Sequence, residues 1–220
     1  EFRTPLAGIS ISSELLEHYF DKMDSQLRLN TLQSIRYRTV ELTTLIDDLL
    51  TQSSAESLSA LYQPIHVDPK IVCEDLLQDF LSLLSTPTHR IELTADSYLP
   101  YVAWDKRLIK HIFRNLLTNG MKYSSEGSVI SVDLRFRDNQ LVVEVSDQGA
   151  GISQEDLPHV FTAFYRSKRT EKIKGTGLGL TIVKEFVEMH SGYLHIHSEI
   201  GIGTTVSVYF PSIIDATIDA

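Results

Sequence analysis

The apolar residues of this chain change their spacing near residue 57, and this change restricts the chain to a fold with two unlike parts. After Gly8, no Gly or Pro occurs up to residue 57, and apolar side chains recur every three or four residues. The first series comprises Leu6, Ile9, Leu16 and Phe20 with Ser13 among them, and the second has heptad spacing and comprises Leu29, Leu32, Ile35, Thr39, Leu42, Leu45, Ile46 and Leu49. The two series predict a helical hairpin over residues 1–57.

Each of the two predicted helices has a broad apolar face. Two such helices cannot bury both faces against each other, so we expect a second hairpin to complete a four-helix bundle. The sequence therefore predicts a homodimer.

Residues 58–66 are predicted to be a linker, because the surrounding stretch TQSSAESLSALYQP is rich in Ser and other small residues. Beyond it, helices are expected over 71–85 and 106–123, the second with Asp105 as its N-cap. Alternating strands flank the turn signal Asp138-Asn139, and the same design recurs around Gly201 and Gly203. The prediction is an α+β domain over residues 67–213, followed by a C-terminal tail over 214–220.

Composition excludes several classes of protein. The net charge of −9 argues against nucleic acid as the main partner, because phosphate-backbone binders need a basic face. A single cysteine, Cys73, excludes an internal disulfide and fits a reducing, cytoplasmic location. No apolar run of about 18 residues and no signal-peptide pattern occurs, although the sequence leaves open whether an upstream region anchors the protein to a membrane.

Polar side chains follow one face of the predicted helix 106–123. Asn115, Asn119 and Lys122 are spaced at i, i+4 and i+7, with Tyr123 beside them. Amide oxygens suit Mg²⁺, which keeps phosphate oxygens and water among its ligands, and Lys122 would then meet a phosphate. Taken alone, this helix fits a solvated polar face equally well.

Three glycine-bearing turns favour a nucleotide site. Asp147 ends the strand LVVEV and begins DQGAG, where Gly149 and Gly151 allow the backbone to come close to a ligand such as an adenine amino group. The motif GTGLGL at residues 175–180 leads into a helix and presents backbone N–H groups to phosphates. It lacks the later glycine of a dinucleotide fingerprint, and no Walker sequence occurs.

Basic residues cluster between these turns in FTAFYRSKRTEKIK. Phe161, Phe164 and Tyr165 can anchor a loop, and the cations on that loop are Arg166, Lys168, Arg169, Lys172 and Lys174. In an acidic protein this cluster favours a lid that faces an anion over a solvated loop.

Taken together, these motifs resemble the catalytic core of a two-component sensor histidine kinase. In family order, EFRTPL is similar to the H box, NLLTNGMKYS to the N box, DQGAG to G1, FTAFYR to the F box, GTGLGL to G2 and GIGTT to the last glycine turn. The resemblance covers nearly all 220 residues. It implies a dimeric four-helix bundle followed by a Bergerat-type α/β sandwich that binds ATP and Mg²⁺.

The resemblance also implies residue roles. Asn115 and Asn119 would hold Mg²⁺, Lys122 and Arg166 would touch phosphate, and Asp147 would bind adenine. The other nucleotide-binding residues that it implies are Tyr123, Gly149, Gly151, Tyr165, Gly175, Thr176, Gly177, Leu178, Gly179, Leu180 and Thr205.

The H box carries the implied chemistry of phosphoryl transfer. The phosphoacceptor histidine is expected immediately before Glu1, which would accept a proton from one imidazole nitrogen while the other attacks the γ-phosphate. Thr4 resembles a residue that positions water for phosphatase activity, and Pro5 would kink the helix. The implied partners are a response-regulator receiver domain, which accepts the phosphoryl group on an aspartate, and an upstream sensor domain outside this chain.

Two other functions are compatible with parts of the pattern. ATP hydrolases of the same nucleotide-binding superfamily place a Glu four residues before the metal-binding Asn, whereas Asn115 stands at that position here, which disfavours hydrolysis. A degenerate, non-catalytic dimerising scaffold would be expected to have lost a glycine or an Asn, and ATP binding would distinguish it. The sequence leaves open whether phosphate moves within a protomer or across the dimer.

Overall fold

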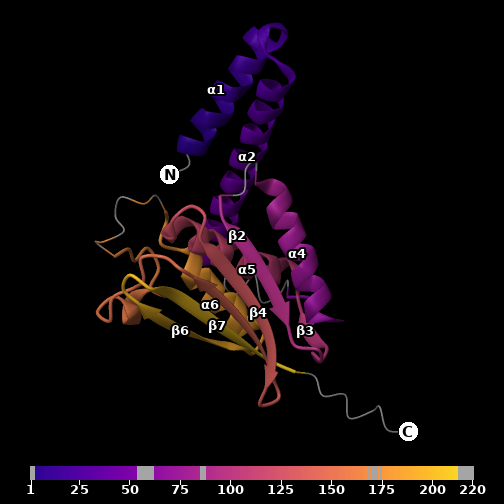
Figure 1. Cartoon of the computed structure of the whole chain (residues 1–220), viewed down its shortest axis with the longest axis vertical. Coiled ribbons are helices and arrows are strands. Elements are labelled where there is room, and N and C mark those ends of the chain that lie inside the picture. Colours follow the sequence, from indigo (N-terminus) through magenta and orange to yellow (C-terminus); the bar gives the residue numbers. More distant parts are fainter. Residues whose placement is uncertain are drawn as a thin grey trace. The chain divides into compact units, whose positions relative to one another are not determined.

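The computed structural model describes residues 3–53, 62–84, 88–167, 169, 173 and 175–212, and within the second helix it describes side chains up to residue 42, except those of 37, 40 and 41. The chain divides into two compact units, residues 1–58 with 78–87, and residues 59–77 with 88–220 (Figure 1).

The first unit contains the predicted helical hairpin. Helix α1 spans Arg3–Tyr19, the short 3-10 helix η1 spans Phe20–Lys22, and α2 spans Ser25–Ser53. Asp24 caps α2, because its Oδ1 accepts a hydrogen bond of 2.7 Å from the backbone N–H of Leu27. Pro5 is a buried residue of α1.

The apolar faces of the hairpin stay largely in solvent. Among its described side chains only Pro5, Met23 and Thr31 are buried. The exposed large apolar residues, between 41% and 58% exposed, are Leu6, Ile11, Leu15, Tyr19, Phe20, Leu27, Leu29 and Leu32. One hairpin therefore does not bury its own apolar surface.

The second unit is built around a five-stranded sheet in the order β2-β4-β5-β7-β6. Its strands are β2 (Arg90–Ala95), β4 (Val129–Arg137), β5 (Gln140–Asp147), β6 (Tyr193–Glu199) and β7 (Gly203–Pro211). All neighbouring strands are antiparallel except β2 and β4. The remaining elements of this unit are β1 (Ile65–Val67), β3 (Val102–Trp104), α5 (Lys106–Tyr123), η2 (Leu157–His159) and α6 (Gly179–Met189). Helix α4 (Pro69–Leu83) begins in this unit, and its residues from Gln78 onward are grouped with the first unit.

Two predicted turns connect the antiparallel strands. Asp138 and Asn139 have φ angles of 51° and 60°, the left-handed values of a tight hairpin turn between β4 and β5. Gly203 has a φ of 147° and ends the turn between β6 and β7. These two turns were predicted correctly because their residues tolerate positive φ.

Helices α5 and α6 cover one face of the sheet. The inward side chains alternate along the strands, and the buried ones are Ile130, Val132, Leu134, Leu141, Val143, Val145, Val206, Val208 and Phe210. Trp104 of β3 packs edge-on against Phe210, with ring centroids 5.1 Å apart. The predicted α+β class, with helices on one face of a mostly antiparallel sheet, is confirmed.

Two boundaries differ from the predictions. Helix α4 begins at Pro69 rather than residue 71, because Asp68 accepts hydrogen bonds from the backbone of Lys70 and Ile71 and so caps the helix. Ile65 and His66 were assigned to the linker, yet they form a strand that pairs with β3. Along the described ranges, no helix has the length and apolar character needed to cross a membrane.

Candidate functional site

Three polar side chains of α5 lie at the loop that precedes α6. Asn115 Oδ1 lies 2.8 Å, and Asn119 Nδ2 3.8 Å, from the point where a Cβ on Gly179 would stand. Lys122 Nζ lies where a Cβ on Gly175 would stand, so a side chain at position 175 would displace the end of the lysine. The structure thus brings the polar face of α5 together with the glycine motif 175–180.

The two asparagines offer neutral oxygen ligands. Asn115 Nδ2 donates a hydrogen bond of 3.1 Å to the carbonyl of His111, which leaves its Oδ1 directed towards Gly179. The described residues contain no group of three or more His, Cys, Asp or Glu able to hold a metal. A divalent cation at this site would therefore rely on amide oxygens, phosphate and water, which is a donor set that suits Mg²⁺.

Asp147 stands at the end of β5, beside α5. Gly149 donates a backbone hydrogen bond of 2.8 Å to Asp147 Oδ1. Burial raises the pKa of this carboxyl, and hydrogen bonds from the backbone of Gly149 and Thr204 only partly offset it. Gly120 of α5 lies beside this residue, because a Cβ on Gly120 would stand at an ordinary contact distance of 3.5 Å from the Cβ of Asp147. A further donor would stabilise this carboxylate.

The DQGAG loop packs on the turn between β6 and β7. Gly151, with a φ of 67°, is in contact with the carbonyl of Glu199, and Gly203 is in contact with the carbonyl of Asp147. Tyr123 accepts a hydrogen bond of 3.1 Å from the backbone of Ala150, and its ring lies 4.9 Å from Lys122 Nζ. Close backbone contact explains the glycines of both motifs.

The structure does not place Thr205 with the other predicted residues. Thr205 pairs with Ser146, and their hydroxyls lie 2.8 Å apart on the sheet face opposite the helices. Thr204 pairs with Asp147 instead and faces the helices, because side chains alternate along a strand. We therefore replace Thr205 by Thr204 in the candidate site.

The glycine motif at residues 175–180 contacts the lid and forms the start of α6. A Cβ on Gly177, which has a φ of 75°, would stand 2.8 Å from the carbonyl of Tyr165, and Phe164 donates a backbone hydrogen bond to Gly177. Leu178 takes the N-cap position of α6 without a capping side chain. Thr176 Oγ1 accepts a hydrogen bond from the Leu178 backbone. The first N–H groups of α6, beginning at Gly179 and Leu180, thus have no side-chain cap and suit an anion.

The base of the lid is organised by Asp156, which sequence reasoning missed. Its carboxylate accepts hydrogen bonds from Ser153 Oγ at 2.7 Å, Tyr165 Oη at 2.5 Å and Ser167 Oγ at 2.8 Å. These hydrogen bonds lower the pKa of Asp156 to about 2. No periodicity or motif indicated this residue, because its partners become neighbours only in the folded loop.

The predicted phosphate-binding cation of the lid is exposed. Arg166 lies between the two lid residues bound by Asp156, and its Nη2 donates a hydrogen bond of 2.6 Å to the carbonyl of Ile173. The predicted lid cations Lys168, Lys172 and Lys174 lie outside the described residues.

The two H-box residues belong to the other unit. Thr4 is exposed in the first turn of α1, and Glu1 lies outside the described residues. Their catalytic roles stay predictions.

The sheet covered by α5 and α6, with an uncapped glycine turn at α6, defines a nucleotide-binding domain. The chain belongs to the family of histidine kinase-, DNA gyrase B-, and HSP90-like ATPases, whose family model matches residues 104–214. Membership of this ATP-binding family supports ATP as the ligand of the site.

Individual relatives agree with this assignment. The chain is 33% identical to drug sensory protein A of Synechocystis, over 93% of this chain and 32% of that protein. It is 32% identical to sensor histidine kinase WalK of Bacillus subtilis, over 96% of this chain and 35% of that protein. The chain thus spans 32% and 35% of the length of these two relatives.

A solved structure agrees on the fold. The histidine kinase AdeS of Acinetobacter baumannii has a TM-score of 0.63 and 23% identity, with 96% of both chains covered. The predicted family and fold class are confirmed.

Proposed function

We propose that this chain is the catalytic core of a sensor histidine kinase, which transfers the γ-phosphoryl group of ATP to a histidine and then to an aspartate of a response-regulator receiver domain. The observation that carries the proposal is the meeting of Asn115, Asn119 and Lys122 with the glycine motif before α6. The named sensor kinase among the relatives supports it.

In this proposal ATP lies between α5 and the loops around it. The adenine amino group donates to Asp147, whose half-buried carboxylate accepts hydrogen bonds and donates none. The phosphates meet the uncapped N–H groups of α6, and Lys122 balances their charge. Arg166 of the lid would exchange its hydrogen bond to Ile173 for a phosphate oxygen.

Asn115 and Asn119 would hold Mg²⁺ through their amide oxygens. When bound, Mg²⁺ neutralises charge that develops on the transferred phosphoryl group. The close approach of Asn115 Oδ1 to Gly179 supports this role, because the oxygen lies near the N–H groups proposed for the phosphates.

Phosphoryl transfer requires an acceptor from the H box. We propose that the acceptor histidine precedes Glu1 directly, and that Glu1 accepts the proton of one imidazole nitrogen while the other forms the N–P bond. The bond from the γ-phosphorus to its bridging oxygen breaks, and ADP leaves. Thr4 would position a water molecule that attacks the phosphoaspartate of the receiver domain, so that the P–O bond to the aspartate breaks and inorganic phosphate leaves.

The hairpin is proposed to form the dimer. Residues 1–57 would be the dimerisation and phosphotransfer part, and residues 67–213 the ATP-binding part. The apolar side chains that one hairpin leaves exposed, Leu6, Leu15 and Leu32 among them, would be buried by a second copy.

ATP hydrolysis as the main activity has less support. A hydrolase of this family would use a carboxylate at position 115 to activate water, whereas Asn115 carries an amide that cannot accept a proton at neutral pH. A non-catalytic scaffold would not need the close contacts of Gly175 and Gly179 with α5.

The test is to extend the chain upstream so that a histidine precedes Glu1 within a helical segment, and to incubate it with labelled ATP. We expect an acid-labile, base-stable adduct, because phosphoramidates hydrolyse in acid. Glu1→Gln should slow labelling by about 10², as for a lost general base, with little change in ATP affinity. The matched control is the unextended chain, in which labelling at His18 or another internal histidine would contradict the proposal.

A further inference from the structure

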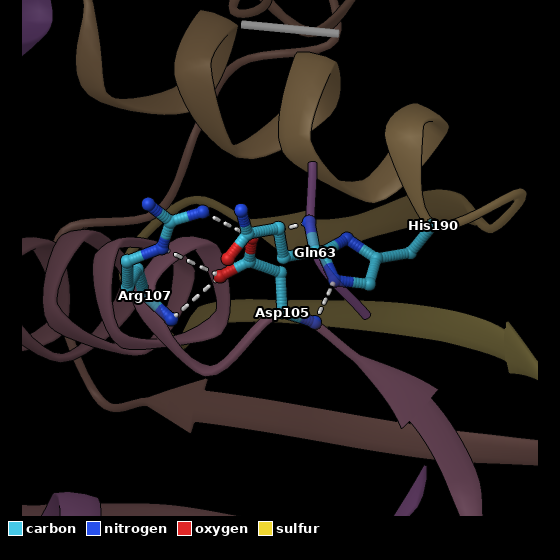
Figure 2. Close-up of polar contacts among 4 residues, drawn as sticks. All are labelled: Gln63, Asp105, Arg107 and His190. Carbon is cyan, nitrogen blue, oxygen red and sulfur yellow. Dashed lines mark hydrogen bonds and ion pairs between the residues drawn. The ribbon is translucent and has the colours of Figure 1, made fainter. Parts of the chain in front are cut away.

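A buried polar cluster lies outside the proposed ATP contacts (Figure 2). Asp105 is 2% exposed, and its backbone N–H donates a hydrogen bond of 3.0 Å to Nε2 of His190, which is 4% exposed. The Asp105 carboxylate accepts hydrogen bonds from the Gln63 backbone at 3.0 Å and from Arg107 Nη2 at 2.8 Å. Buried polar groups with this many partners hold their neighbours in a defined geometry.

Three distant segments meet in this cluster. Asp105 is the N-cap of α5, His190 is the C-cap of α6, and Gln63 precedes β1, where the chain enters the second unit. The ring of Tyr62 packs edge-on against that of His190, with centroids 5.1 Å apart. Tyr62 and Gln63, which belong to the predicted linker, are therefore attached to the ends of both helices.

The cluster needs a neutral imidazole. His190 Nδ1 lies 2.6 Å from the carbonyl of Phe186, so this nitrogen carries the proton and Nε2 accepts from the backbone of Asp105. Burial lowers the pKa of His190, which keeps the ring neutral. Protonation of Nε2 would place two donors against each other.

The same two helices carry the proposed ATP contacts further along their lengths. On α5, Asn115 lies ten residues beyond Asp105, which is about 15 Å along a helix. On α6, the glycine motif lies at the opposite end from His190. A helix transmits a displacement at one end to the other, so the cluster can influence how far Asn115 lies from Gly179.

We propose that Asp105 and His190 are positioning residues for nucleotide binding. By joining the start of the second unit to α5 and α6, they set the spacing between Asn115 and the glycine motif, and they connect the linker to the ATP site. The inference rests on the proposed function, because it assigns those contacts to ATP.

A matched set of variants tests the proposal by isothermal titration of the full chain with ATP and Mg²⁺. His190→Gln keeps a neutral oxygen that can accept from Asp105, whereas His190→Leu removes the acceptor and keeps an apolar volume. We expect His190→Leu to weaken ATP on the order of tenfold, and His190→Gln to stay within about threefold of the wild type.

The control is Val187→Ala, on the same helix and fully buried, which opens a cavity but keeps the backbone carbonyl that accepts a hydrogen bond from His190. It should lower the unfolding temperature but leave ATP affinity unchanged in the folded protein. Wild-type affinity in His190→Leu, or an equal loss in Val187→Ala, would overturn the positioning role.

A second measurement needs no variant to fold. Coupling between two sites is reciprocal, so ATP must slow hydrogen exchange at the Gln63 and Asp105 amides of the wild type if the cluster positions the ATP contacts. Unchanged exchange at saturating ATP would refute the inference. Failure of the proposed function would look different, because the extended chain would bind ATP and show this coupling yet label no histidine.

Discussion

Asn115 Oδ1 on α5 lies 2.8 Å from the position that a Cβ on Gly179 of α6 would occupy. The glycine thus makes room for the end of a side chain, not for backbone, and the contact joins the N-box helix to the proposed phosphate-binding turn. A larger residue at position 179 would displace the amide without disturbing either helix.

Gly179→Ala should therefore weaken Mg²⁺-dependent ATP binding while the chain remains folded. The added Cβ forces Asn115 to rotate, whereas the stability of the fold should change little, because Gly179 is the first residue of α6 and not in the helix interior. Calorimetric titration with and without Mg²⁺, together with thermal unfolding, would measure both effects. Lys184→Ala, at an exposed position of the same helix, is the control. Unaltered Mg²⁺ dependence in Gly179→Ala would mean that Asn115 is not a ligand.

Asp147→Asn should weaken ATP by about 10-fold or more, because an amide donor can face the adenine amino group in place of an acceptor-only carboxylate. The same substitution should raise the stability of the fold at pH 7. The pKa of Asp147 is raised in the folded state, so its contribution is present below the unfolded pKa and is lost as pH rises through the folded pKa. The amide that replaces the Asp147 carboxyl does not ionise, so the variant does not lose this stability at pH 7.

Titration and thermal unfolding of the same Asp147→Asn sample separate these effects. Undiminished affinity would show that adenine is bound elsewhere, and a lower unfolding temperature at pH 7 would contradict the burial argument. Glu199→Gln offers a control, because it also neutralises an acid, at an exposed position of β6.

Asp156→Asn should loosen the base of the lid. An amide cannot accept three hydroxyl donors as the carboxylate does, so the positions of Tyr165 and Ser167 on either side of Arg166 should become less defined. We expect faster hydrogen exchange over residues 165–167 and weaker ATP binding, and little change in ADP binding if the lid contacts the γ-phosphate. The control is Glu155→Gln, one residue away and exposed. Identical exchange in Asp156→Asn and the wild type would exclude this role.

Acid should destabilise the chain through His190. Its folded pKa lies below the unfolded value of 6.5, so its neutral form stabilises the fold above about pH 6.5 and this contribution is lost as pH falls through the folded pKa. Asp105 stays ionised in this range, since burial alone would raise its pKa but hydrogen bonds from Arg107 and Gln63 bring it to about 2.

The His190 prediction is checked by measuring the unfolding temperature between pH 7.5 and about pH 5 in the wild type and in His190→Gln. The wild type should lose more stability than the variant over this window, because the glutamine does not titrate. If the unfolding temperature fell equally with pH in both proteins, His190 would not be the group whose protonation destabilises the fold.

Local features of the sequence were sufficient to predict many of the helices, strands and nucleotide-binding motifs of this protein. The helical period predicted α1 and α2, the alternation of apolar residues predicted the hairpin of β4 and β5, and Asp105 was recognised as the N-cap of α5. The motifs around Asn119, Asp147 and Gly177 indicated ATP because each carries its chemistry within a few residues.

Other features were decided only by packing. Thr204 rather than Thr205 faces Asp147, because the register between β5 and β7 determines which side of the sheet a residue occupies, and a shift of one residue reverses it. The hydrogen bond between Asp105 and His190 spans 85 residues, and Asp156 meets Tyr165 only where the lid folds back. The sequence alone determined most of the helices and strands and the nucleotide-binding motifs, since these depend on local spacing, whereas strand β1 depends on its pairing with β3. The tertiary structure decided which polar groups support them, because hydrogen bonds between distant segments form only after the helices and strands have packed.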